Sequence, residues 1–73
     1  MDLKKNVIKS MRAIIDSREN GRAVDFARRI GISEQRLNNY LHGRRSPDIE
    51  LVADICRIYD VSIEWFIYGG EDD

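Results

Sequence analysis

Polar side chains in the middle of the sequence could form hydrogen bonds to the edges of base pairs. They are Glu34, Gln35, Asn38 and Asn39, and their spacing puts them on one side of a helix. The carboxamides of Gln and Asn carry a donor and an acceptor on one planar group, which fits the N6 and N7 atoms of adenine. The alternative is a plain surface helix, although such faces usually contain Lys and Glu, which form helices better than Asn. These residues alone leave both interpretations open.

A helix with a defined end precedes this polar stretch. Apolar residues recur at spacings that fit one helix face, at Val24, Phe26, Ala27 and Ile30. Gly31 follows, and a residue just past a helix end often needs a left-handed backbone, which glycine adopts without a Cβ penalty. We therefore expect the first of two short helices to stop at Gly31.

The polar stretch itself is predicted to be the second short helix, over residues 34–41. Ser33 precedes it, and its hydroxyl can accept a hydrogen bond from a free amide in the first turn. Ile32 and Leu37 are spaced to pack together across this cap, which would fix the angle between the two helices. Gly43 is expected to end the helix. Its buried side is predicted to consist of Leu37, Tyr40 and Leu41.

Three further helices are predicted around this pair. One covers about residues 3–18, another covers residues 49–59 after a cap at Asp48, and the last covers about residues 63–68 after a cap at Ser62. The first should bury Leu3, Val7, Ile8, Met11, Ile14 and Ile15. The second should bury Ile49, Val52, Ala53 and Cys56, flanked by Ile55 and Tyr59. The last should bury Ile63 and Phe66.

The last predicted helix is too apolar for its length. Trp65, Ile67 and Tyr68 cannot all enter the core together with Ile63 and Phe66. Exposed apolar patches that include aromatic side chains often mark interfaces. We expect a dimer surface at Trp65, Ile67 and Tyr68, and partial burial against the first helix is the alternative.

The order of these residues resembles the Cro/CI-type (lambda-repressor-like, XRE) helix-turn-helix family. The resemblance covers roughly residues 7–69, and the stretch RRSPDIELVADICRIYDVSIEWFIYG is similar to that family's proline, fourth helix and closing segment. It implies an all-α, compact five-helix domain over residues 1–69, with the helix-turn-helix at helices 2 and 3. Residues 70–73 would be a flexible acidic tail or the start of a linker. The central matching positions are Ala27, Gly31, Ile32, Leu37 and Gly43.

The resemblance also implies sequence-specific binding of double-stranded DNA by a prokaryotic or phage-type transcriptional regulator. Such a protein would act as a repressor and bind as a homodimer, with the helix over residues 34–41 in the major groove. Base contacts carried over onto matching positions fall on Glu34, Gln35 and Asn39, with Asn38 and Ser33 next. Phosphate contacts are expected from Arg22, Arg36, Arg44 and Arg45.

The chain departs from the family at the start of the second helix. The family often has a Ser or Thr cap followed by a Gln that holds a phosphate, where this chain has Arg22 and Ala23. We expect Asn20 to provide the cap and Asp25 to favour the positive end of the helix dipole. The charged side chain of Arg22 would bind the phosphate in place of the missing Gln.

The charged residues are unevenly distributed along the chain. The net charge is −1, but residues 1–47 carry 11 of the 12 Lys and Arg and only 5 of the 13 Asp and Glu. Salt screens charges beyond roughly 8–10 Å, so attraction of phosphate depends on the local patch. The asymmetry is either chance or the basic surface of a DNA-binding region, and the second interpretation gains from the position of the helix-turn-helix.

The sequence gives no support for several classes of protein. It shows no nucleophile–base pair, no carboxylate pair and no metal-ligand cluster, and we therefore expect no enzyme, no metal and no cofactor. His42 and Cys56 are the single histidine and cysteine, so an internal disulfide is excluded. No apolar run approaches the ~18 residues of a membrane span. These features fit a cytoplasmic protein.

A second function, from another class, also fits the sequence. The chain could be a protein-interaction module, such as an antitoxin or an anti-repressor-like partner, that binds another protein through the apolar last helix. The acidic second half and the segment from Trp65 to Tyr68 favour this alternative. A protein partner or a missing C-terminal domain is compatible with DNA binding.

Overall fold

The computed structural model describes residues 2–70, in which the chain forms five helices and no strand. The predicted all-α, five-helix fold is confirmed. Of the predicted tail at residues 70–73, residues 71–73 lie outside the described residues. None of the helices in the described part is both long and apolar enough to cross a membrane. The helices are α1 (Leu3–Arg18), α2 (Ala23–Ile30), α3 (Glu34–Leu41), α4 (Ile49–Tyr59) and α5 (Ile63–Ile67).

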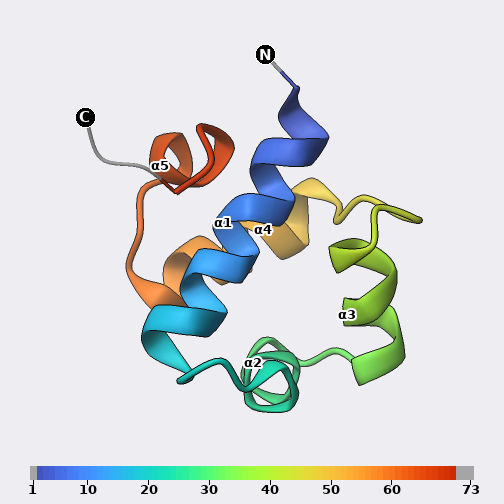
Figure 1. The fold of residues 1–73 in the computed structure, drawn as a ribbon. Helices are drawn as coiled ribbons and strands as arrows, with labels where there is room; N and C mark the ends of the chain where they lie inside the picture. The colour runs from blue at the N-terminus through green and yellow to red at the C-terminus, as the bar shows by residue number, and fades with distance from the viewer. Residues whose placement is uncertain (1, 71–73) are drawn as a thin grey trace.

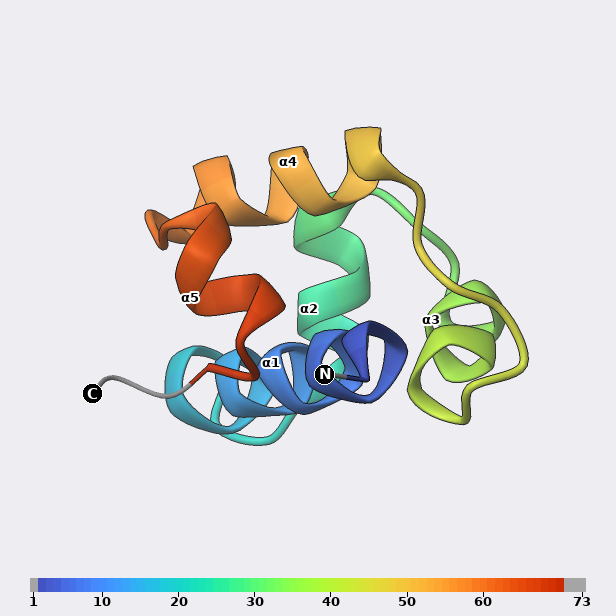
Figure 2. The ribbon, with the colours of Figure 1, turned by 90° about the horizontal axis from the view of Figure 1, so that it is seen from above.

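Helix α3 lies at one edge of the molecule. Helix α1 packs against α5 and α3, and α4 packs against α2 and α5, so these elements enclose the centre (Figure 1). Helix α3 packs against α1 and α2, and in the view from above it stands on the side away from α5 (Figure 2). Much of its surface therefore remains available for a ligand.

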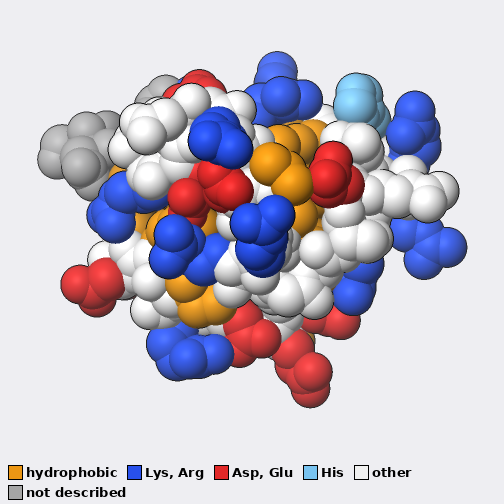
Figure 3. All heavy atoms as spheres, turned by 90° about the horizontal axis from the view of Figure 1, so that it is seen from below, with side chains coloured by type: hydrophobic (Ala, Val, Ile, Leu, Met, Phe, Trp, Pro, Cys, Tyr) orange, Lys and Arg blue, Asp and Glu red, His pale blue; other side chains and the backbone are white. Residues whose placement is uncertain are grey.

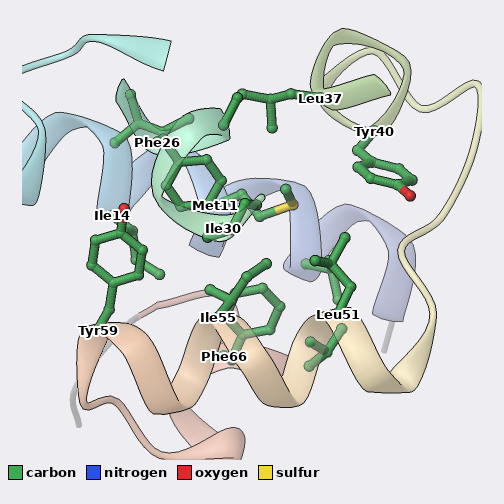
Figure 4. Packing of buried hydrophobic residues seen from close by; sticks show 14 of the residues in the cluster. Met11, Ile14, Phe26, Ile30, Leu37, Tyr40, Leu51, Ile55, Tyr59 and Phe66 are labelled. Carbon is green, nitrogen blue, oxygen red and sulfur yellow. The ribbon is translucent and has the colours of Figure 1, made fainter. Parts of the chain in front are cut away.

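Every helix contributes at least one fully buried side chain to a single core. The rings of Phe26 and Tyr59 stack with their centroids 5.5 Å apart, and such pairs stabilise a core beyond the apolar area that they bury. Figure 4 shows these side chains converging between α1, α2 and α4. The largest fully buried apolar side chains are Met11, Ile14, Phe26, Leu37, Ile55 and Phe66.

Side-chain caps begin four of the helices. Ser33, Asp48 and Ser62 accept hydrogen bonds from backbone amides three residues later, as predicted, and Asp2 does the same for α1. The predicted cap of α2 at Asn20 is wrong. Asn20 lies in the preceding turn with a φ of +53°, and α2 has no side-chain cap.

The predicted buried face of α4 is rotated by about one residue from the observed one. Ile49 is 71% exposed and Ala53 is exposed, while Leu51 and Ile55 are buried. The reason is that α4 turns toward α2 and α5, so its first residue projects past the end of the core. Leu3 and Ile63 were also expected inside, but they lie beside Ile49 around an open groove. The exposed fractions of Leu3 and Ile63 are 53% and 45%.

Candidate nucleic-acid interface

The joint between α2 and α3 is held by backbone hydrogen bonds around Gly31. Its φ of +80° places it in the left-handed region, and its amide donates to the carbonyl of Arg28 at 3.2 Å. The amide of Ile32 reaches back to the carbonyl of Ala27 at 3.0 Å, which completes the usual glycine-terminated helix end. The Ser33 hydroxyl then accepts from the amide of Arg36 at 3.1 Å. Together these bonds fix the direction in which α3 leaves α2.

Helix α3 is divided into an apolar and a polar side. Leu37, Tyr40 and Leu41 are buried, which confirms the predicted inner face. The predicted base-contacting residues lie on the other side. Ser33, Glu34, Gln35 and Asn38 are exposed, and Asn39 is half-buried.

Asn39 is the most constrained of the polar side chains. Its Oδ1 atom accepts a hydrogen bond of 3.4 Å from Nη1 of Arg44. Its backbone carbonyl accepts from the amides of Arg44 and Arg45, at 2.9 and 3.2 Å. Asn39 therefore ties the loop after α3 to the helix, and the order of this loop depends on its contacts with α3.

Arg36 is held against the side of α3 by Tyr40. Its Nε atom donates a 2.7 Å hydrogen bond to the Tyr40 hydroxyl, and its guanidinium carbon lies 5.7 Å from the centre of the tyrosine ring. Both contacts restrict the side chain without neutralising its charge. Arg36 is thus presented as an oriented cation beside the polar face.

A polar hollow of about 610 Å³ lies between α3 and the loop that follows it. Among the predicted site residues, it brings together Ser33, Gln35, Arg36, Asn39 and Arg45. Tyr40, Ser46 and Asp48 complete its lining. The hollow therefore combines amide side chains, which can form hydrogen bonds in both directions, with two guanidinium groups that attract anions.

Other predicted contacts lie outside this hollow. Arg22 is at the start of α2, and its Nε atom forms an ion pair of 3.0 Å with Asp25. Glu34 and Asn38 are on the exposed surface of α3 but do not line the hollow. Figure 3 shows Lys and Arg side chains at the end of the molecule that carries α3, with acidic side chains also present on this face.

The three predicted dimer-surface residues lie in different surroundings. Trp65 is half-buried, and its ring lies so close to Gly70 that a Cβ atom on that glycine would be 3.1 Å from the ring. Ile67 is half-buried and lines an apolar groove of about 380 Å³, together with Leu3, Ile49 and Ile63 among others. Tyr68 is 56% exposed.

The described residues also contain a buried polar cluster that sequence reasoning missed. The Glu19 carboxylate is 7% exposed and accepts hydrogen bonds of 2.7 Å from both the Tyr59 hydroxyl and Nε of Arg29. These two donors, Tyr59 first, lower the pKa of Glu19. Burial and the neighbouring carboxylate raise the pKa of Tyr59 well above its usual value. The cluster links the end of α1 to α2 and α4, away from the polar hollow.

Comparison with known proteins agrees with this arrangement. Residues 12–66 match the family model HTH_3, described as a helix-turn-helix, which covers well over half of the chain. A search of curated proteins and a search of solved structures each found no match.

Proposed function

We propose, since the chain belongs to the Cro/CI-type (XRE) helix-turn-helix family of DNA-binding regulators, that it is a repressor that binds a specific DNA sequence as a dimer. The observation that carries this proposal is the hollow beside α3. There the base-reading candidates Gln35 and Asn39 lie next to the cations Arg36 and Arg45. Occupying DNA that a polymerase needs is sufficient for repression. We place the protein in the cytoplasm, where such DNA is found.

Helix α3 is proposed to lie in the major groove with its polar side toward the bases. Gln35 and Asn39 suit adenine, because each amide can donate to N7 and accept from N6. Glu34 suits cytosine, whose N4 amino group donates a hydrogen bond. Its charge would also repel phosphates at sites of the wrong sequence. Asn38 and Ser33 are the neighbouring candidates for base contacts.

The phosphate contacts are proposed to come from Arg36, Arg44 and Arg45 around α3 and from Arg22 at the start of α2. The loop after α3 carries two of these cations and is tied to α3 by Asn39. Phosphate contacts provide affinity and register rather than sequence preference. Without DNA, Arg22 forms an ion pair with Asp25, so part of its charge is already neutralised.

A second copy of the chain is proposed to dock on the apolar groove that Ile67 lines. A single domain of this size contacts little DNA, and related geometries use two half-sites about one helical turn apart. The residues that line the groove include the cations Lys4 and Arg45. Exposed Glu50 and Glu64 directly follow its lining residues Ile49 and Ile63. In a two-fold dimer we propose that these cations of each copy approach the carboxylates of the other.

The experiment that tests this function is selection of a binding site from a random-sequence duplex library, at two salt concentrations. Enrichment of a two-fold symmetric site is the expected result. Steeply salt-dependent binding without enrichment would leave only a basic patch and would count against sequence reading. Absence of binding at low salt would overturn the proposal and favour the protein-interaction alternative, with α5 and its groove as the surface to examine.

A further inference from the structure

We propose that Arg12, in α1, is a positioning residue that fixes the C-terminal end of α3 and so sets the angle at which α3 meets DNA. The inference rests on the proposed function of α3. Its starting observation is a hydrogen bond of 3.2 Å from Nη2 of Arg12 to the backbone carbonyl of Leu41, 29 residues away.

The two ends of α3 are held in different ways. Its N-terminal end is fixed locally, by the backbone bonds at Gly31 and the cap at Ser33. Its C-terminal end is followed by a loop, at the edge of the molecule (Figure 2). Besides the buried side chains of Tyr40 and Leu41, the contact with α1 holds this end against the rest of the fold.

The helix dipole of α3 makes Arg12 a favourable partner for this end. Helices α1, α2 and α4 each have an arginine in their own last turn, whereas α3 has no basic residue there. The C-terminal carbonyls of a helix carry partial negative charge and are stabilised by a nearby cation. Arg12 provides this cation from α1.

Packing between α1 and the end of α3 supports the same contact. A Cβ atom on Gly43 would lie 3.7 Å from Cε of Lys4 and 3.8 Å from Cδ1 of Ile8, so the backbone there runs close beside α1. Asn39 is only two residues before Leu41. A shift of this end would therefore move Asn39 relative to a base pair, while flexible arginines could still reach phosphates. Binding sites require such supporting contacts to hold their geometry.

Replacement of Arg12 by methionine tests the proposal, because methionine keeps an unbranched chain and removes the donor. We expect Arg12→Met to bind the duplex selected by the wild-type protein about tenfold more weakly. Affinity for a mixed-sequence duplex should change less than about twofold, and the dependence of affinity on salt should be unchanged. Hydrogen exchange at the amides of residues 42–45 should become faster. Arg12→Lys should recover part of the loss, because lysine keeps one donor and the charge.

Arg18→Met is the matched control, because it removes the same charge from an exposed position in the last turn of α1. It should change none of these measurements. Thermal unfolding followed by circular dichroism establishes that each variant is folded. If Arg12→Met does not fold, Arg12→Lys is tested in its place.

Three results would overturn the positioning role. The first is an equal loss on both duplexes together with a salt slope reduced by about one, since this would make Arg12 a phosphate contact. The second is unchanged exchange at residues 42–45. The third is faster exchange without any loss of preference for the selected duplex. If the wild-type protein selects no duplex, the proposed function fails, and the exchange measurement alone decides whether Arg12 holds α3.

Discussion

The hydroxyl of Tyr59 donates a 2.7 Å hydrogen bond to the carboxylate of Glu19, which lies 40 residues earlier in the chain. Arg29 donates to the same carboxylate oxygen. One buried carboxylate at the end of α1 thus receives hydrogen bonds from α2 and α4. Unpaired buried charges are strongly unfavourable, so the three side chains are expected to act as a unit.

The stability of the fold should depend on pH through Glu19. Its hydrogen bonds lower its pKa from the usual value of 4.5. A lowered pKa in the folded state contributes stability above the unfolded pKa, and this contribution is lost as pH falls through the folded pKa. We therefore expect Glu19→Gln to lower the melting temperature at pH 7, and the difference from wild type to shrink below about pH 4.5. Thermal unfolding between pH 3 and pH 7 measures this.

Asp16→Asn, at an exposed position in α1, is the control for a general effect of losing a carboxylate. It should leave the pH profile close to that of the wild type. A Glu19→Gln profile that stays parallel to wild type down to pH 3 would show that the ionised carboxylate contributes no pH-dependent stability.

Substitution of Gly31 should destabilise the protein because of the backbone conformation at this position and not because of neighbouring atoms. A Cβ atom there would meet nothing within 4 Å, but the φ of +80° is unfavourable for residues with a Cβ. We expect Gly31→Ala to lower the free energy of unfolding by about 1–2 kcal/mol in urea titration. Gly31→Asn should cost less, because Asn tolerates the left-handed region. Equal losses for the two variants would assign the cost to something other than φ.

Local features of the fold could be read from the sequence, since their causes lie within a few residues. Ser33, Asp48 and Ser62 cap amides three residues later, and the glycine after α2 marks its end. Each of these depends on short-range chemistry. The inner side of α3 was also predictable, because its apolar residues recur at helical spacing.

Features that depend on distant partners could not be read in this way. The burial of Ile49 and Ile63 was predicted wrongly, because a residue in the first turn of a helix is buried only if another element lies beside it. The Glu19–Tyr59 bond and the Arg12–Leu41 bond join residues 40 and 29 positions apart. No periodicity along the chain identifies such pairs. The base and phosphate contacts stay predictions.

Asn39→Ala should relax sequence preference at one base pair. The lost amide is worth about 1–3 kcal/mol of discrimination against the wrong base. Arg44→Ala should instead weaken binding to all sequences alike and reduce the salt slope by about one. Binding of both variants to the selected duplex, to single-base variants of it and to a mixed-sequence duplex separates these effects. If Asn39→Ala loses equal affinity for specific and mixed duplexes, Asn39 does not read a base.

Ile49→Glu should prevent the proposed dimer without unfolding the protein. Ile49 is 71% exposed and lines the apolar groove, so the free energy of unfolding of the monomer should change by less than about 0.5 kcal/mol. Two carboxylates placed at an apolar contact between copies would, however, be desolvated and close to each other. We expect sedimentation equilibrium to report monomers and affinity for a two-half-site duplex to fall at least about tenfold, while a single half-site binds as before. Ile58→Glu is the matched control, because Ile58 is on α4, is 36% exposed and does not line the groove. If both variants remain as dimeric as the wild type, the second copy docks on a different surface, and the exposed Tyr68 just after α5 is the next position to substitute.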